Sequence, residues 1–435
     1  MEKLLEMAKK VCDQAEIYYN EPNSSEVLFQ KGELHDIESQ FQSGIALRII
    51  KDGKLGFSYT KNLIDREEFL QNALDSLKGG VKAGYSFPLT KELPQFNTYD
   101  PHVEKVTSVE MVDHCQGMAD VIMEETDAEL EIAGYKETRT IRIMNTNGTD
   151  LQNISGSNGY WVNLIYPGGG AGLSRIFEEK KPFTVSKKDI AELIELYNSS
   201  SKVIDITSDK MQVLFMPGCM YTFLWRLLSG TSAKSIFENI SPIKEDIGKK
   251  IMSDMISFYD DPHDDSVPGA RSFDDEGVRT RKFSIIEKGV LKNFFYDLNY
   301  AKKLNAESTG HGYRSSMWGG DPITMTPTPS LRHPRIEIGD KSFEELVSMM
   351  DTGIILDGAM GAHSGNIPNG DYSVGVSPGL YVENGEIIGR VKDVMVAGNV
   401  YDTLKKVIAV ENKLHTCWGG RMPAILCENI SVSSK

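Results

Sequence analysis

The sequence predicts an α+β protein with two domains. We expect an N-terminal α/β domain with an antiparallel sheet and flanking helices, followed by a C-terminal, mostly-β, barrel-like domain. Segments of period-two hydrophobicity alternate with helical patterns in the first part of the chain, whereas the second part is rich in Gly and in short strand patterns. The polar stretch 198–202 separates the two compositions and predicts domains at residues 1–202 and 203–435.

Size and charge limit the class of protein. The chain has 435 residues, of which 40% are hydrophobic and 25% charged, as in globular proteins that bury a substantial core. The formal net charge of -15 argues against broad electrostatic binding to nucleic acid or to an anionic membrane surface. We therefore expect neither nucleic acid nor a membrane as a partner.

The N-terminal segment and the cysteines indicate a cytoplasmic protein. An amphipathic pattern predicts a helix over 3–16, without the continuous apolar core of a signal peptide. No segment approaches the roughly 18 uncharged apolar residues of a membrane span. The five cysteines form no CxxC pair, which favours free thiols in a reducing compartment. They are Cys12, Cys115, Cys219, Cys417 and Cys427.

Turn and cap signals place the elements of the N-terminal half. Asp52-Gly53 predicts a hairpin between two alternating runs. Helices are expected over 65–78, capped by Asp65 and closed by Gly79, and over 108–126, where Thr107 and Glu110 have capping-box spacing. A strand meander follows over 129–182, with expected turns at Asn147-Gly148, at Asn158-Gly159 and in "PGGGAG", and then a helix over 187–200.

The C-terminal half contains few helical patterns. A Pro-Gly pair and a nearly unbroken apolar run predict a buried helix over 217–229, and another helix is expected over 342–351. The segments "EKGVLKNFFYD" and "ENGEIIGRVKD" each predict a hairpin. The Gly-rich segment 166–174 lacks the lysine of a phosphate loop and opens no helix, so a hairpin turn is the better interpretation.

Four segments are candidates for chemistry. The acidic segment 260–277, around His263, lacks EF-hand spacing, and a solvated loop is the favoured interpretation. His415 and Cys417 would share one face of a strand, as a nucleophile with its base, as metal ligands, or as a buried thiol beside a strand histidine. Two Gly-rich loops could approach a ligand or another strand closely and edge a groove, or could be ordinary surface turns. Their candidate contacts are Gly310, His311, Gly312, Arg314, Gly361 and His363.

Six segments together carry a family resemblance. They are "SFDDEGV" (272–278), "IIEKGVLKNFFYDLNYAKKLN" (285–305), "STGHGYR" (308–314), "GLYVENGEI" (379–387), "VMVAGNVYDTL" (394–404) and "CWGGRMPAILCENISV" (417–432). In order and spacing they resemble the TldD/PmbA family, whose members bear the name modulators of DNA gyrase. The chain is most similar to the PmbA (TldE) branch, over nearly its whole length.

The resemblance implies a two-subunit peptidase. TldD is a metallopeptidase subunit with an HExxxH helix and a later cysteine that completes a zinc site. TldE pairs with it as a heterodimer, and the pair cleaves unfolded peptides in an enclosed cavity. Aligned on Pro217-Gly218, the histidine positions hold Thr222 and Leu227, the glutamate position holds Phe223, and Cys417 holds the place of the third ligand. A zinc site needs about three protein ligands, so this chain lacks the donors.

The leading prediction is therefore a non-catalytic, PmbA/TldE-like subunit of a cytoplasmic metallopeptidase. We expect no catalytic residue, metal or cofactor in this chain, and zinc in a TldD-like partner that shares an unfolded peptide substrate with it. The chain alone could form a homodimer, and the sequence does not decide this. Two alternatives stay open: a metal-independent hydrolase that uses Cys417, and a protein that regulates DNA gyrase by direct contact.

Overall fold

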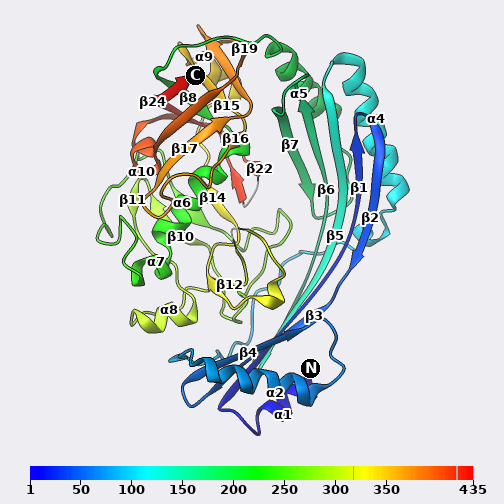
Figure 1. Ribbon diagram of the computed structural model, residues 1–435, viewed down its shortest axis with the longest axis vertical. Helices are drawn as coiled ribbons and strands as arrows, with labels where there is room; N and C mark the ends of the chain where they lie inside the picture. Colours follow the sequence, from blue (N-terminus) through cyan, green and yellow to red (C-terminus); the bar gives the residue numbers. More distant parts are fainter. Residues whose placement is uncertain (317, 418–419, 435) are drawn as a thin grey trace.

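The computed structural model describes residues 1–316, 318–417 and 420–434 and confirms the α+β class. Figure 1 shows a tall, curved N-terminal sheet standing beside a C-terminal half whose sheets curl into a half-barrel. Both ends of the tall sheet contact the C-terminal half, so the space between the two halves is bordered by strands from distant parts of the sequence.

The N-terminal sheet is antiparallel at every described strand pair. Its order is β4-β3-β1-β5-β6-β7, and β2 pairs with the second half of β1. The strands are β1 (Gln14–Gln30), β2 (Glu33–Phe41), β3 (Gly44–Lys51), β4 (Lys54–Thr60), β5 (Glu129–Asn145), β6 (Asp150–Ile165) and β7 (Gly172–Glu179).

Helices cover this sheet on its outer face. The long helix α4 packs its apolar residues on β1 and β5, and α5 lies against α4 and the C-terminal half, while α1 and α2 cover β1, β3 and β4 at the opposite end. The helices are α1 (Glu2–Ala8), α2 (Arg66–Ser76), α3 (His102–Lys105), α4 (Ser108–Glu125) and α5 (Lys187–Ser199), and a 3₁₀ turn, η1, spans Leu77–Gly79.

Local capping confirms where two of these helices begin. The Asp65 carboxylate accepts from the backbone N–H groups of Glu67 and Glu68 at the start of α2. Thr107 and Glu110 form the complete capping box of α4. After α2 the left-handed residue is Gly80, with φ 72, one position beyond the predicted Gly79.

Two predictions in this half are wrong. The helix expected over 3–16 ends at Ala8, because Ala15 and Ile17 belong to β1 and are buried against the α2 core. Asn158-Gly159 forms no turn and lies inside the continuous strand β6. A Cβ atom at Gly159 would stand 2.3 Å from the Tyr135 ring, so the glycine makes room for a ring on the neighbouring strand.

The C-terminal half contains two larger sheets in the described part of the chain. The first has the order β16-β17-β20-β24-β8-β15-β18-β19, with β21 paired to β24, and the second has the order β11-β10-β9-β14-β23-β22. The first comprises β8 (Asp209–Phe215), β15 (Thr352–Leu356), β16 (Ala359–Met360), β17 (Asp371–Val376), β18 (Gly379–Glu383), β19 (Glu386–Val391), β20 (Val394–Asn399), β21 (Val407–Val410) and β24 (Ile425–Ser434). The second comprises β9 (Phe258–Asp260), β10 (Phe283–Glu287), β11 (Val290–Leu291), β14 (Pro334–Ile336), β22 (His415–Cys417) and β23 (Gly420–Met422).

Short elements complete this half. The two expected hairpins are confirmed as β10–β11 and β18–β19, with positive φ at Lys288-Gly289 and Asn384-Gly385. The remaining elements are β12 (Gly312–Tyr313), β13 (Thr328–Pro329), η2 (Pro217–Cys219), α6 (Tyr221–Thr231), α7 (Ala233–Phe237), α8 (Leu298–Lys303), η3 (Pro322–Thr324), α9 (Phe343–Ser348), α10 (Val400–Thr403) and η4 (Leu404–Lys406). The predicted boundary at residue 202 falls between α5 and β8 and stays a prediction.

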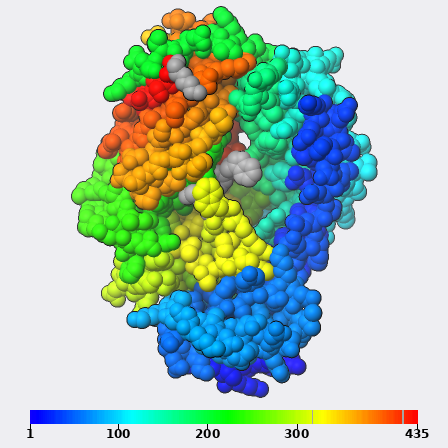
Figure 2. Space-filling model, viewed as in Figure 1, coloured from blue at the N-terminus to red at the C-terminus, as the bar shows by residue number. Residues whose placement is uncertain are grey.

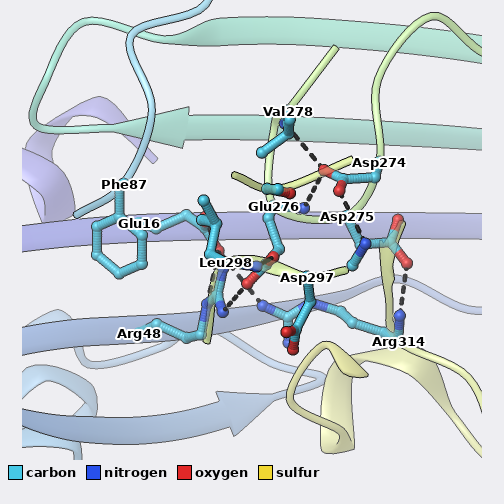
Figure 3. Close-up of polar contacts among 12 residues, drawn as sticks. Glu16, Arg48, Phe87, Asp274, Asp275, Glu276, Val278, Asp297, Leu298 and Arg314 are labelled. Atoms are coloured by element: carbon cyan, nitrogen blue, oxygen red, sulfur yellow. Dashed lines mark hydrogen bonds and ion pairs between the residues drawn. The ribbon is translucent and has the colours of Figure 1, made fainter. Parts of the chain in front are cut away.

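Buried charges join the two halves at the lower end of the tall sheet. Figure 3 shows the Arg48 guanidinium of β3 between the carboxylates of Glu16 on β1 and Glu276 of the C-terminal half. Arg48 donates two hydrogen bonds to Glu16, at 2.9 and 2.8 Å, and one to Glu276 at 3.0 Å. Glu276 also accepts from the backbone N–H of Leu298 at 2.7 Å. All three charged side chains are fully buried, and we refer to this contact as the seam.

No helix among the described residues is long and apolar enough to cross a membrane.

Candidate functional site

A cavity of about 560 Å³ opens between the N-terminal sheet and the C-terminal half. The space-filling view shows a hollow where these two parts meet (Figure 2). The cavity is lined by β7, by the turn that leads into α6, and by β22 with the segment before it. It therefore lies at the upper end of the interface, away from the seam.

Two strand edges border this cavity. Within the described residues, β7 pairs only with β6, and β22 pairs only with β23. Cα atoms of the two strands approach within 8 Å, so the free edge of each sheet faces the same space. A free edge offers backbone N–H and C=O groups that pair with the backbone of an extended peptide. Binding of this kind depends little on the side chains of the peptide.

An ion pair between a half-buried arginine and a buried carboxylate forms part of the cavity wall. The Arg175 guanidinium on β7 donates to both carboxylate oxygens of Asp357, at 2.9 and 3.1 Å. Asp357 follows β15, so the pair links the two sheets across the cavity. A Cβ atom at Gly218 would meet the Asp357 carbonyl oxygen at 2.6 Å, so only glycine fits at the start of η2.

The histidine of β22 is held by a carboxylate. His415 Nε2 lies 2.9 Å from Glu411, whose Oε2 also accepts from the backbone N–H of Ala424 at 2.9 Å. Glu411 is buried, so its position and that of the imidazole are well defined. Among the described contacts, none joins His415 to Cys417, although both residues line the cavity.

The Cys417 thiol is in a protonated, buried state. Its Sγ donates to the carbonyl of Gly420 at 3.4 Å, and only 8% of the residue is exposed. Burial raises the pKa of the Cys417 thiol to about 12. Because the thiolate is the nucleophile and the metal ligand, this environment suits neither role at neutral pH.

Helix α6 places in the core the three positions at which the family resemblance implies the two histidines and the glutamate of a zinc site. Thr222, Phe223 and Leu227 are only 2%, 1% and 1% exposed, and none of them lines the cavity. The Phe223 ring packs against Phe215, with centroids 4.6 Å apart, and against Tyr372 at 5.5 Å. These side chains provide no zinc donor apart from a hydroxyl.

The exposed face of α6 has no stronger donors. It carries Tyr221, which lines the cavity, and Trp225, whose ring centroid lies 5.4 Å from that of Tyr221. No His, Cys, Asp or Glu occurs in the described residues of α6. Across the described ranges of the chain, no group of three or more such residues is placed to hold a metal ion. The residues present therefore do not fit a catalytic zinc.

The first Gly-rich loop lies in the core rather than along the cavity. The His311 ring lies between Phe283 and Phe295, and its Nδ1 is 2.8 Å from the hydroxyl of Thr309. A Cβ atom at Gly310 would clash with a backbone carbonyl at 2.5 Å, and one at Gly312 with the Glu276 carboxylate at 2.3 Å.

The remaining predicted contacts also lie elsewhere. The buried Arg314 guanidinium lies over the Tyr18 ring at 4.5 Å, beside the seam. Gly361 has φ +75 in a turn, and His363 is exposed with its ring 6.1 Å from that of Trp318. None of the six predicted contact residues is among the described residues that line the cavity, and their peptide contact stays a prediction.

The acidic segment 260–277 is not a solvated loop, and that prediction is wrong for most of its carboxylates. Asp260, Asp274, Asp275 and Glu276 are all buried. The Asp274 carboxylate accepts from three backbone N–H groups, and Asp275 pairs with Arg271 at 2.7 Å. The clue in the sequence was the arginine among the acidic residues, because buried carboxylates need such partners.

Comparison with protein-family models identifies two matching domains. Residues 208–434 match the PmbA/TldA metallopeptidase C-terminal domain, and residues 15–86 match PmbA/TldA metallopeptidase domain 1. Among curated proteins, a metalloprotease of Methanothermobacter thermautotrophicus is 26% identical over 91% of this chain and 87% of its own length. The metalloprotease PmbA homolog of Haemophilus influenzae is 23% identical over 99% of this chain and 94% of its own.

Two solved structures share the fold over the whole chain. TldE from Thermococcus kodakarensis superposes with a TM-score of 0.90 at 23% identity and covers 100% of both chains. A Thermotoga maritima protein with the provisional name of modulator of a DNA gyrase gives a TM-score of 0.86 at 26% identity, with 99% of both chains covered.

Proposed function

Because the chain belongs to the PmbA/TldD metallopeptidase family, we propose that it is a PmbA/TldE-type, non-catalytic subunit of a two-subunit peptidase. Its partner would be a TldD-like subunit that carries zinc and the catalytic groups. The substrate would be an unfolded peptide, and the complex would work in the cytoplasm.

The observation that carries this proposal is the chemistry of α6. The helix beside the cavity has no His, Cys, Asp or Glu, and Phe223 and Leu227 fill the core behind it. A metal-dependent hydrolysis needs about three ligands and an open coordination position for water. The cavity is nevertheless present, with its walls fixed by the pair of Arg175 and Asp357.

The role of this chain would be to hold the peptide. The free edges of β7 and β22 can each accept a strand, so an extended peptide could pair with backbone groups on either side of the cavity. Recognition through the backbone tolerates many side chains, as an unfolded substrate requires. The arrangement makes the cavity a holding site that brings the peptide to the active site of the partner.

Zinc content and peptidase activity test this proposal. Both would be measured on the purified chain, on a TldD-like protein from the same source, and on their mixture, with an unfolded fluorogenic peptide as substrate. We expect zinc in the partner only, and activity that rises when this chain is added. Stoichiometric zinc and EDTA-sensitive activity in this chain alone would overturn the proposal.

Regulation of DNA gyrase is the second candidate, favoured by the provisional name of the Thermotoga maritima relative. The net charge of -15 is compatible with a protein partner and not with broad DNA contact. Co-purification of gyrase with the tagged chain would support direct regulation. A gyrase supercoiling assay that does not respond to added chain would exclude it.

A further inference from the structure

Strand β2 is the free edge of the N-terminal sheet on the side opposite the cavity. In the described structure it pairs only with β1, while β7 lies at the other edge, beyond β5 and β6. Every residue of β2 is exposed, and Figure 1 shows the strand at the outer border of the molecule. Such an edge presents unpaired N–H and C=O groups with which another strand can pair.

One face of β2 carries an apolar stripe. Leu34 stands opposite Phe29 and Ile37 opposite Val27, and residues that pair across a ladder share a face. Phe29 and Val27 are fully buried beneath α4. Leu34, Ile37 and Phe41 continue this apolar face beyond the helix, where they are 45%, 48% and 68% exposed.

The other face of β2 is acidic. Glu38 stands directly opposite Glu26 on β1, and Asp36 is its neighbour on the same face. Burial, followed by the charges of Glu38 and Asp36, raises the pKa of the Glu26 carboxyl. Among the ion pairs of the described residues, none includes these three carboxylates. Like charges placed opposite one another destabilise a ladder, so a cation on this face would be stabilising.

We propose that the free edge of β2 receives an extended strand of a partner subunit, in which apolar residues alternate with Lys or Arg. Successive residues of an added strand point to opposite faces, so its apolar side chains would cover the stripe of Leu34, Ile37 and Phe41. Its basic side chains would then meet Glu26, Asp36 and Glu38. The partner is the catalytic subunit of the proposed function, and in this respect the inference rests on it.

The pattern of charge selects this occupant over two others. A second copy of β2, paired antiparallel about Ile37, would place Asp36 opposite Glu38 in both strands, which repel. A substrate peptide would lie at β7, because the cavity borders that edge of the sheet. A strand with basic residues from a different subunit is compatible with both faces of β2.

Two short synthetic peptides with the same composition test the pattern. In one, Lys alternates with Val and Ile; in the other, all Lys precede Val and Ile. Binding of each labelled peptide to the full chain would be measured by fluorescence anisotropy. We expect the alternating peptide to bind at least about tenfold more tightly, because only it can cover both faces of the edge. Equal binding would overturn the proposal, since net charge alone would then explain it.

Two variants locate the binding edge. The Ile37 N–H donates to the Asp36 side chain at 2.8 Å, so it points away from β1. Ile37→Pro therefore removes a donor and one apolar side chain from the free edge without removing a hydrogen bond to β1. Asp36→Lys with Glu38→Lys reverses the charge of the acidic face. Glu192→Lys with Glu195→Lys makes the same charge change on the exposed face of α5 and serves as the control.

We expect both β2 variants to weaken binding of the alternating peptide by about tenfold or more, and the α5 control to leave it unchanged. Equal weakening by the α5 control would overturn the assignment. If the chain alone formed a dimer that Ile37→Pro dissociates, the occupant would be a second copy, and the proposal would be wrong.

The same variants separate this inference from the proposed function. If mixing with the TldD-like protein produced activity that Ile37→Pro did not reduce, the proposed function would stand and the docking edge would be wrong. If the mixture were inactive while the alternating peptide still bound at β2, the docking edge would stand and the proposed function would fail.

Discussion

His415 and Cys417 share one face of β22, but their polar atoms have different partners. The imidazole contacts Glu411 at 2.9 Å, while the Cys417 thiol donates to a backbone carbonyl. Burial holds the pKa of this thiol at about 12, so almost none of it ionises at neutral pH. At the scale of single residues, the pair is therefore a poor candidate for a nucleophile and its base.

The rate of Cys417 alkylation measures how much of this thiol is ionised. In the native chain at pH 7.5, we expect iodoacetamide to modify Cys417 more than about a hundredfold more slowly than in the urea-unfolded chain, because the thiolate is the reacting species. Mass spectrometry of tryptic peptides would follow each site.

Cys12 is the internal reference, since it is only half-buried and burial raises its thiol pKa to about 11. A Cys12→Ser background would remove its signal and leave the four buried cysteines, among which the tryptic peptides identify Cys417. Rapid native labelling of Cys417 would contradict the protonated thiol and would support the hydrolase alternative.

At the scale of elements, apolar packing holds α6 in position. Phe223, Leu224 and Leu227 belong to the core that fills the C-terminal half, and Arg226 donates to backbone carbonyls, among them that of Asp371 at 2.7 Å. The helix thus serves as a core element beside the cavity. Its buried face stabilises the surrounding sheets instead of presenting reactive groups.

Truncation of Phe223 tests the core role of the helix. We expect Phe223→Ala to lower the free energy of unfolding by about 3 to 5 kcal/mol, because a buried ring is lost and a cavity remains. Urea titration followed by circular dichroism would give the value. Leu228→Ala, on the partly exposed face of α6, is the matched control and should cost clearly less. Equal costs would contradict the packing described here.

At the scale of the whole molecule, the seam holds the two halves together with buried charges. Arg48 neutralises part of the charge of Glu16 and Glu276, but Asp297 adds another carboxyl at the start of α8. Its Oδ1 caps the helix through the N–H of Tyr300 at 2.7 Å. Burial, and then the charge of Glu276, raises the pKa of the Asp297 carboxyl to about 8.

This carboxyl makes stability depend on pH. An unfolded Asp has a pKa of about 3.9, so between pH 4 and 8 the native state holds a proton that the unfolded state has lost. The Asp297 contribution to stability therefore falls as pH rises through this window. We expect Asp297→Asn, which keeps the helix cap, to be more stable than the wild type at pH 9 by about 1 kcal/mol or more.

Thermal unfolding at several pH values between 5 and 9 would measure the effect. The melting temperature of Asp297→Asn should fall less steeply with pH than that of the wild type. Asp65→Asn makes the same change at the exposed cap of α2 and controls for the loss of a capping carboxylate. Parallel curves for the wild type and Asp297→Asn would contradict a protonated Asp297 beside the seam.

Local signals in the sequence were sufficient for several elements. Asp65, and Thr107 with Glu110, cap helices through groups within three residues, so their positions could be predicted without the fold. The hairpins at Asp52-Gly53 and Asn384-Gly385 follow from residues that accept positive φ. Asn158-Gly159 carries the same signal and is part of a strand, because the neighbouring Tyr135 ring needs the space.

By itself, the sequence determined the α+β class, the family resemblance and the absence of metal donors from α6, since these depend on residue types and their local order. Tertiary structure alone decided that most carboxylates of the acidic segment 260–277 are buried, that Thr222 and Leu227 face the core, and that β7 and β22 border one cavity. Burial, register and sheet edges depend on which distant segments pack together, and no local pattern encodes that choice.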